Sequence, residues 1–241
     1  MRIAACQLPY LDHDVEQAVL TIVRYAKKAA DEGAALVCFP ECYLQGYVHG
    51  LEDYRKVAIG LSSDEFSRIL TKLADLKPTL VFGLIEWDEN ELHNTAVVVR
   101  DGKLLGRYRK TMLLKGESMF RAGSEYPVFE VEGLKFGINL CNDLNFPDCA
   151  RAIAEQGAEL LVCPCNNMLS PANAELWKHK HQEIRRQRAR ETGMFLLSSD
   201  VVGEWNGRIS YGSTSLIGPD GEIREEIDFL REGMVVQELS L

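Results

Sequence analysis

Apolar residues follow two kinds of spacing along the chain. They are nearly continuous in residues 2–8 and 34–39, whereas they recur every three to four positions between residues 12 and 31. Short continuous runs are typical of buried strands, and the wider spacing is typical of a helix with one buried face. Gly33 closes the helical segment, as glycine often does at a helix C-terminus. The pattern therefore predicts a strand, a helix and a second strand at the start of the chain.

This alternation continues and then returns in the second half. Ser62-Ser63-Asp64-Glu65 is typical of a helix start, and residues 41–60 have no clear period, so we expect a loop-rich segment there. Further predicted helices span 147–156 and 172–191, and further predicted strands span 79–85, 159–164 and 194–199.

The middle of the chain has a hairpin pattern instead. Residues 93–99 and 103–107 flank the tight turn Asp101-Gly102, and residues 126–131 and 134–140 flank Glu132-Gly133. Short turns between such runs are typical of β-hairpins. Three more strands are expected at 212–217, 222–227 and 234–239.

Strand–helix units at both ends with hairpins between them predict an α/β fold built of layers. We expect helices outside and sheets of mixed strand direction inside, and two roughly similar halves would give two mixed sheets packed face to face. The 241 residues fit one domain, 1–241, because single α/β domains often reach this length.

The composition and charge of the chain exclude some classes of function. The net charge of -9 argues against nucleic acid as a partner, because phosphate binding needs a basic surface. We find no apolar run of about 18 residues, so no membrane span is expected. The N-terminus enters a strand pattern directly and lacks a signal-peptide layout. Seven cysteines, several inside apolar runs, favour a reducing compartment, and we expect a cytoplasmic protein.

Cys141 stands between a predicted strand and the helix that Phe146-Pro147-Asp148 opens. At such a turn backbone N–H groups point at an anion forming nearby, and the helix dipole favours a thiolate. Packing is the ordinary role of a free cysteine, so this position alone leaves both interpretations open.

Two other polar residues occupy similar places. Glu41 follows the apolar run 34–39 and Pro40, at the strand edge where α/β sites usually form, and burial would make it a usable base. Lys110 follows Arg107 and Arg109, where cations usually mark a solvated hairpin end, although a lysine can also stabilise developing negative charge. Glu117 is uninformative by itself.

Other motifs carry no chemistry. His179 and His181 are two apart on a predicted helix and do not share a face. The basic run 185–190 is interleaved with glutamates, as in a salt-bridged helix. The cysteine spacings do not fit a zinc site, and no glycine-rich nucleotide loop is present. We predict neither a metal nor another cofactor.

Taken together, the chain resembles the nitrilase superfamily of carbon–nitrogen hydrolases. The family signature is a glutamate, a lysine and a cysteine in this order, and the similarity covers nearly the whole chain. Its segments here are Phe39-Pro40-Glu41 with Gly46-Tyr47, Tyr108-Arg109-Lys110, Leu140-Cys141-Asn142-Asp143 with Phe146-Pro147, Arg188-Ala189-Arg190-Glu191, and Gly212-Ser213-Thr214-Ser215 before Pro219-Asp220-Gly221.

The resemblance implies an α-β-β-α sandwich, frequent homodimers and a second glutamate near the site, whose place Glu117 matches. Departures are Asn142, where an aromatic residue is common, Asn145, where arginine or tryptophan is frequent, and Thr192, where asparagine is common. They bear on substrate choice and assembly and remove no reacting group.

We therefore expect hydrolysis of a small amide through a cysteine thioester. Glu41 would be the base, Cys141 the nucleophile and Lys110 an oxyanion donor, with Glu117 orienting Lys110 or the water. The backbone N–H of Asn142 would complete the oxyanion site, and Asn166, Asn167 and Tyr47 are candidates for substrate contact.

Three alternatives remain. A nitrilase would use the same groups on a nitrile. A cysteine–histidine glutaminase would need glycines at the positions of Asn139 and Asp143. A binding protein could keep the fold without catalysis.

Overall fold

The computed structural model describes residues 1–47 and 51–239. Its strands are β1 (Arg2–Pro9), β2 (Ala34–Cys38), β3 (Thr79–Asp88), β4 (Glu91–Arg100), β5 (Lys103–Arg109), β6 (Val128–Val131), β7 (Leu134–Ile138), β8 (Leu160–Pro164), β9 (Phe195–Trp205), β10 (Arg208–Ser210), β11 (Ser215–Ile217), β12 (Ile223–Glu226) and β13 (Gly233–Glu238). Its helices are α1 (Val15–Asp31), α2 (Leu51–Val57), α3 (Asp64–Leu73), α4 (Pro147–Ala154), α5 (Pro171–Trp177) and α6 (Lys180–Thr192), with 3-10 helices at Lys115–Glu117 and Cys141–Asn145.

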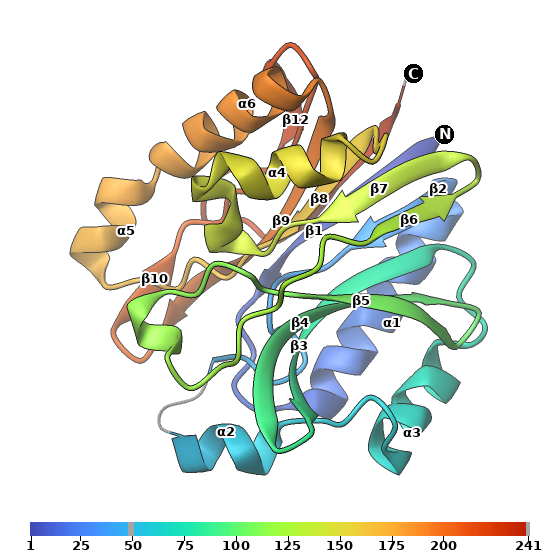
Figure 1. Cartoon of the computed structure of the whole chain (residues 1–241), viewed down its shortest axis with the longest axis vertical. Coiled ribbons are helices and arrows are strands. Elements are labelled where there is room, and N and C mark those ends of the chain that lie inside the picture. The colour runs from blue at the N-terminus through green and yellow to red at the C-terminus, as the bar shows by residue number, and fades with distance from the viewer. Residues whose placement is uncertain (48–50, 240–241) are drawn as a thin grey trace.

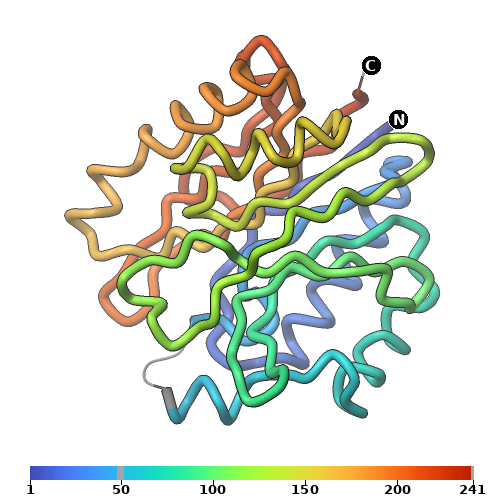
Figure 2. Tube along the Cα trace, viewed as in Figure 1, coloured from blue at the N-terminus to red at the C-terminus, as the bar shows by residue number. Residues whose placement is uncertain are grey.

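The strands form two mixed sheets. In the first sheet the order is β5-β4-β3-β2-β1, and in the second it is β9-β8-β7-β6. The pairs β1–β2, β2–β3, β7–β8 and β8–β9 are parallel, while the predicted hairpins β4–β5 and β6–β7 are antiparallel. The ends of β1 and β9 also pair, Gln7 opposite Asp200, and so connect the two sheets. Antiparallel pairing of β1 with β13 brings the two ends of the chain together (Figure 2).

Three apolar cores separate the layers. The core between the sheets joins residues such as Ile3 and Leu36 of the first sheet to Phe136 and Val162 of the second. A second core includes buried residues of α1 and α3 with those of the first sheet, and a third includes buried residues of α4 and α6 with those of the second. The helices thus cover the outer faces (Figure 1). The predicted α-β-β-α sandwich is confirmed.

Two helix starts show how the sequence sets the element bounds. The Asp14 side chain accepts a hydrogen bond from the Gln17 N–H at the start of α1, and Ser63 does the same for Phe66 at the start of α3. Each cap satisfies a backbone donor that the first helical turn leaves unpaired. The start predicted near Ser62 is therefore confirmed.

Three predicted segments were wrong in part, and one short strand was missed. Helix α2 occupies the stretch expected to be loop-rich; at seven residues it is too short for a period, although its charges run from acidic to basic as the helix dipole favours. The helix predicted at 172–191 is two helices, α5 and α6, with a turn at 178–179 where Trp177 stacks on His181. Strand β9 continues past its predicted end because the polar Asp200 is buried and hydrogen-bonded. The short strand β10, which pairs with β9, was not predicted.

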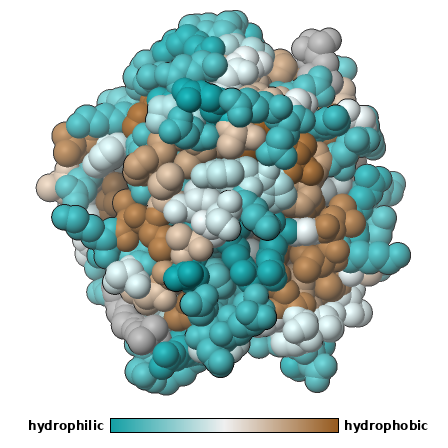
Figure 3. Space-filling view, viewed as in Figure 1, coloured by the Kyte–Doolittle hydropathy of each residue, from teal (hydrophilic) through white to brown (hydrophobic). Residues whose placement is uncertain are grey.

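Several large apolar side chains are exposed on the described surface. Large apolar side chains that are exposed include Leu20, Leu105, Leu114, Leu176 and Leu230. Hydrophilic side chains cover most of the face drawn in Figure 3, and apolar ones gather in separate patches. Among the described helices, none has the length and apolar character needed to cross a bilayer.

Candidate active site

A buried lysine joins two carboxylates at the edge of the first sheet. Lys110 follows β5, and its Nζ lies 2.8 Å from Oε1 of Glu41 and 2.7 Å from Oε1 of Glu117. The three side chains are at most 5% exposed. Glu41 follows β2, and Glu117 ends a 3-10 helix. Residues from three separate segments thus form one ion-paired cluster.

Asn94 organises this cluster, and the sequence analysis missed it. Its Nδ2 donates to Oε1 of Glu41 at 2.8 Å, to the Tyr47 hydroxyl at 2.8 Å and to Oε1 of Glu117 at 3.2 Å. The Tyr47 hydroxyl also donates to Glu117 at 2.8 Å. A signal was present, because Asn94 is an amide within the apolar strand β4, and a buried amide needs partners.

The two oxygens of Glu41 have different surroundings. Oε1 accepts from Lys110 and Asn94, whereas the buried Oε2 has no hydrogen-bond partner among the described residues. A cavity of about 250 Å³ is lined by Glu41, Lys110, Glu117 and Cys141. The four predicted catalytic residues therefore line one cavity, and one carboxylate oxygen has unused acceptor capacity. The rest of the lining is Tyr10, Tyr47, Tyr54, Leu114, Gly116, Asn166, Met168, Leu169, Trp205 and Arg208.

Cys141 lies at a sharp turn after β7 and begins a 3-10 helix. Its φ is +43°, in the left-handed region that costs a non-glycine residue of order 1–3 kcal/mol. Strain of this kind persists where the surroundings fix the backbone. The Cys141 Sγ donates to Oδ1 of Asn167 at 3.6 Å.

Asp143 fixes the turn and ties it to the segment of Lys110. Its carboxylate accepts 2.8 Å hydrogen bonds from the backbone N–H of Leu140 and of Met112, and another from the Tyr108 hydroxyl. Tyr108 and Met112 flank Lys110 in sequence. One buried carboxylate thus connects the lysine of the first sheet to the cysteine of the second.

The thiol of Cys141 is protonated at rest. A hydrogen bond with Cys165, burial and the Glu41 charge raise its pKa well above the ordinary value. A thiolate favoured by the helix dipole was expected; α4 begins at Pro147 as predicted, but the raised pKa of Cys141 favours the protonated thiol instead. Burial also raises the pKa of Glu41, although the Lys110 charge acts in the opposite direction. Burial would lower the pKa of Lys110, but its anionic neighbours outweigh it and raise that pKa.

Gly83 of β3 leaves room for the Glu41 backbone. A Cβ at this position would lie 2.3 Å from the Cys42 nitrogen and 2.7 Å from the Glu41 Cα. The Gly83 N–H donates to the Pro40 carbonyl at 3.1 Å. Only a glycine allows this close approach, which sets where Glu41 lies.

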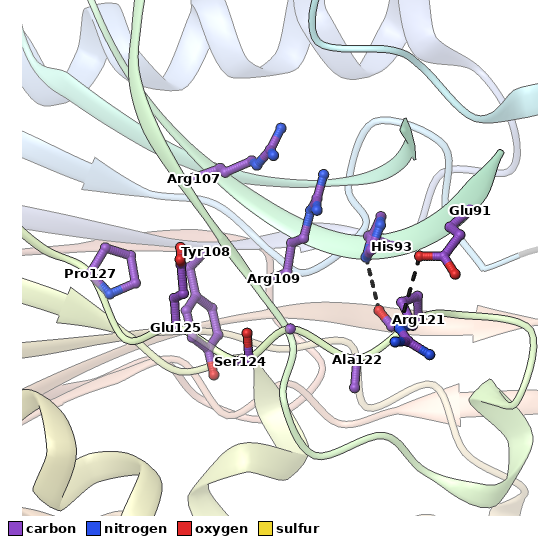
Figure 4. Close-up of a pocket in the computed structure, with 11 residues that line it drawn as sticks. Glu91, His93, Arg107, Tyr108, Arg109, Arg121, Ala122, Ser124, Glu125 and Pro127 are labelled. Carbon is purple, nitrogen blue, oxygen red and sulfur yellow. Dashed lines mark hydrogen bonds and ion pairs between the residues drawn. The ribbon is translucent and has the colours of Figure 1, made fainter. Parts of the chain in front are cut away.

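A separate cleft lies at the end of β5, next to Lys110 in sequence. Arg107, Tyr108 and Arg109 all line a polar cleft of about 320 Å³, with Tyr108 pointing to the opposite side of the strand from the two arginines (Figure 4). Both arginines are paired with Glu86. The cleft therefore has cations whose charge is already balanced, and we do not assign chemistry to it.

The predicted substrate-binding residues lie around Cys141. Asn166 and Tyr47 line the cavity of Glu41, and the buried Oδ1 of Asn166 has no hydrogen-bond partner within residues 1–47 and 51–239. Asn167 and Asn142 line an adjacent cavity that also contains Cys141. Asn142 donates from its side chain to the Met112 carbonyl at 2.9 Å. The structure thus brings all of them to the two cavities beside Cys141.

The family is decided by comparison with known sequences. The family model described as carbon-nitrogen hydrolase matches residues 2–241. The chain belongs to this family. It is 30% identical over 219 residues to a nitrilase of Pyrococcus abyssi, across 89% of this chain and 80% of that protein. It is 29% identical to an omega-amidase of Xenopus tropicalis, across 82% of this chain and 74% of that protein.

A solved structure agrees with these relatives. A variant of the Nesterenkonia AN1 amidase, a member of the nitrilase superfamily, superposes with a TM-score of 0.87 at 26% identity, across 100% of this chain and 92% of that one. The protein is a carbon–nitrogen hydrolase of amidase or nitrilase type, and its sandwich fold is the one that the resemblance implied.

Proposed function

We propose that this carbon–nitrogen hydrolase cleaves small amides through a thioester on Cys141. The observation that carries the proposal is Oε2 of Glu41, a buried carboxylate oxygen with no partner in the described part of the chain, on a side chain that lines the same cavity as Cys141. A thiol that is protonated at rest needs a base, and an unused carboxylate oxygen with a raised pKa is suited to that role.

In the first half-reaction the Cys141 sulfur attacks the amide carbon and its proton passes to Glu41. Lys110 and the backbone N–H of Asn142 stabilise the oxyanion. Two of the three Lys110 donors are used by Glu41 and Glu117, which leaves one for the substrate. Each oxyanion donor contributes about 10² to 10³ in rate. Glu41 then protonates the leaving nitrogen, the C–N bond breaks, and ammonia leaves a thioester.

In the second half-reaction water attacks the thioester carbon while Glu41 takes its proton. The tetrahedral intermediate collapses, the C–S bond breaks, and the proton returns to sulfur as the carboxylic acid leaves. Glu117 holds Lys110 throughout and acts as a positioning residue. Covalent catalysis replaces one difficult step with two easier ones.

Related proteins support this assignment. One structure of the Nesterenkonia amidase, 25% identical to this chain, has the acetamide moiety of fluoroacetamide added covalently at its active-site cysteine, and another is a complex with butyramide. These are small amides, which is the substrate class proposed here.

The test is ammonia release from butyramide and propionamide by wild type and Cys141→Ala. We expect a loss of more than about 10⁴-fold in kcat for Cys141→Ala, since removing a nucleophile removes the covalent route. Wild type, quenched in acid during turnover, should carry an acyl group on Cys141 by mass spectrometry. Cys149→Ser is the matched control, because Cys149 is a buried thiol that already has polar neighbours.

Wild-type rates in Cys141→Ala would overturn the nucleophile assignment. A side-by-side assay with butyronitrile distinguishes amide hydrolysis from nitrile hydrolysis. If only the nitrile were turned over, Cys141 would remain the proposed nucleophile, and the proposed substrate would become a nitrile.

A further inference from the structure

A second cavity of about 190 Å³ lies on the other side of Cys141. It shares Leu114, Cys141, Asn166 and Leu169 with the cavity of Glu41, so the two spaces meet at the cysteine. Its walls are largely apolar, with Leu144 and Ile184 among them. The proposed mechanism places the leaving nitrogen beside Glu41 and does not use this second space.

Arg185 of α6 lines the second cavity. Its side chain is 2% exposed, and its guanidinium donates to the Ser213 carbonyl and, at 3.1 Å, to the Cys165 sulfur. Among the described residues no carboxylate lies within ion-pair distance of it. Asp200 is the acidic side chain that acts on it from further away, and its oxygens already accept from Asn167, Ser213 and Val201.

A buried cation without a contacting counter-ion is costly unless a ligand supplies one. Arg185 has five N–H donors, and its two recorded partners are both uncharged. An arginine of this kind at a cavity wall suits a planar anion such as a carboxylate.

His181 adds an independent observation. Its Nε2 is buried, has no hydrogen-bond partner in the described chain, and belongs to a ring that lines the same cavity. Burial lowers the pKa of His181 to about 3, so the imidazole is neutral and, with its proton on Nε2, is a donor. The ring is held by stacking on Trp177 at 5.3 Å. Two donors that lack an anionic partner thus line one cavity.

We propose that the second cavity binds an acyl chain that ends in a carboxylate, and that Arg185 is the residue that selects it. The substrate class is then the monoamide of a short dicarboxylic acid. At about 30 Å³ per water, the cavity has room for about six waters, which suits a chain of four or five carbons. This inference rests on the proposed amide hydrolysis and deepens it.

The experiment compares matched amides with and without the distal charge. Succinamate is paired with valeramide and glutaramate with hexanamide, and kcat and KM are measured for wild type, Arg185→Met and Arg185→Lys. We expect wild type to prefer each carboxylate by about 10²-fold in kcat/KM, since a buried polar group left unpaired discriminates strongly. Arg185→Met should lose most of this preference, chiefly through KM, and Arg185→Lys should recover part of it.

Arg190→Met is the control on the same helix, because Arg190 is exposed and pairs with Glu183 at 3.1 Å. It should keep the wild-type preference. Succinate and glutarate should inhibit wild-type turnover of butyramide competitively and should inhibit Arg185→Met at least tenfold more weakly.

Three results would overturn the inference: no preference for the carboxylate in wild type, equal loss on both amides of a pair in Arg185→Met, or no inhibition by the diacids. The first and third need only wild type, so they decide the matter if Arg185→Met does not fold. Butyramide turnover separates the two proposals, because its absence would refute the amide hydrolysis itself, whereas its presence without a carboxylate preference would refute only the role of Arg185.

Discussion

Two carboxylate clusters lie on the first sheet, and only one has unused hydrogen-bonding capacity. Glu41 and Glu86 are both 1% exposed at the side chain, and both pair with cations from the β5 segment. Each oxygen of Glu86 accepts two hydrogen bonds: Oε1 from Arg107 and Arg109, and Oε2 from Arg109 and Thr95. Glu41 accepts through one oxygen and leaves the other without a partner.

The difference shows what distinguishes a reactive cluster from a structural one when the residue types are the same. A carboxylate whose two oxygens both accept hydrogen bonds stabilises the fold and has no free acceptor site at which to take a proton. An incompletely bonded one costs stability, because a buried acceptor without a partner is unfavourable. The cluster of Glu41 therefore gives up stability that the cluster of Glu86 retains.

The largest expected effect comes from Glu41→Gln compared with Glu86→Gln. Glu41→Gln removes the proposed base, and we expect kcat/KM on butyramide to fall by at least about 10³-fold. Lys110 keeps Glu117 as its counter-ion in this variant, so the midpoint of urea unfolding should fall less than in Glu86→Gln.

Glu86→Gln is expected to do the reverse. It breaks a buried ion pair and should lower the free energy of unfolding by about 3 kcal/mol, while kcat/KM changes less than fivefold. Urea unfolding and ammonia release, measured on both variants, check the comparison. Equal losses of activity in the two variants would contradict it.

A smaller effect is expected from Gly83→Ala, which leaves every reacting group in place. The new Cβ would displace the Glu41 backbone, and a shift of about 1 Å in a catalytic group costs about 10² in rate. We expect kcat to fall by about that factor. Gly233→Ala in β13 is the control, since its Cβ would meet nothing nearer than 3.5 Å. A wild-type kcat in Gly83→Ala would show that the position of Glu41 is not set by this contact.

The smallest effect concerns pH. Glu41 acts as a carboxylate, so activity is lost as the pH falls through its pKa. That pKa is raised by burial, and the Glu117 charge adds to the rise. Glu117→Gln removes this charge and should move the acidic limb of kcat/KM to lower pH, with a loss of about tenfold at the optimum because Lys110 loses a partner. An unmoved or upward-moved limb in the pH profile would reject the coupling of Glu117 to Glu41.

Much of the layer structure could be predicted because long elements repeat their period. Helix α1 and the hairpin β4–β5 extend over enough residues for the spacing to be read. Helix α2 does not. The break between α5 and α6 at residues 178–179 leaves the spacing of apolar residues unchanged, so the sequence pattern did not reveal it.

The residues of the candidate site also fall into those that the sequence indicated and those that it did not. Resemblance led to Glu41, Lys110, Glu117 and Cys141, which the structure places around one cavity, and their roles remain predictions. The sequence analysis grouped Lys110 with Arg107 and Arg109, although strand alternation could have set Lys110 apart, because side chains two apart share a face. Contacts between segments far apart in the sequence, such as those of Arg185, depend on packing and carry no local signal, whereas Asn94 left one as an amide within an apolar strand.

The proposed base and nucleophile belong to different sheets, since Glu41 follows β2 and Cys141 follows β7. The apolar layer between the sheets, with Leu36 facing residues such as Phe136, is therefore also the spacer that sets the clearance between oxygen and sulfur. A methylene added or removed deep in that layer acts on the reaction without touching any polar group. The turnover rate is thus expected to depend on the volume of the apolar side chains packed between the two sheets.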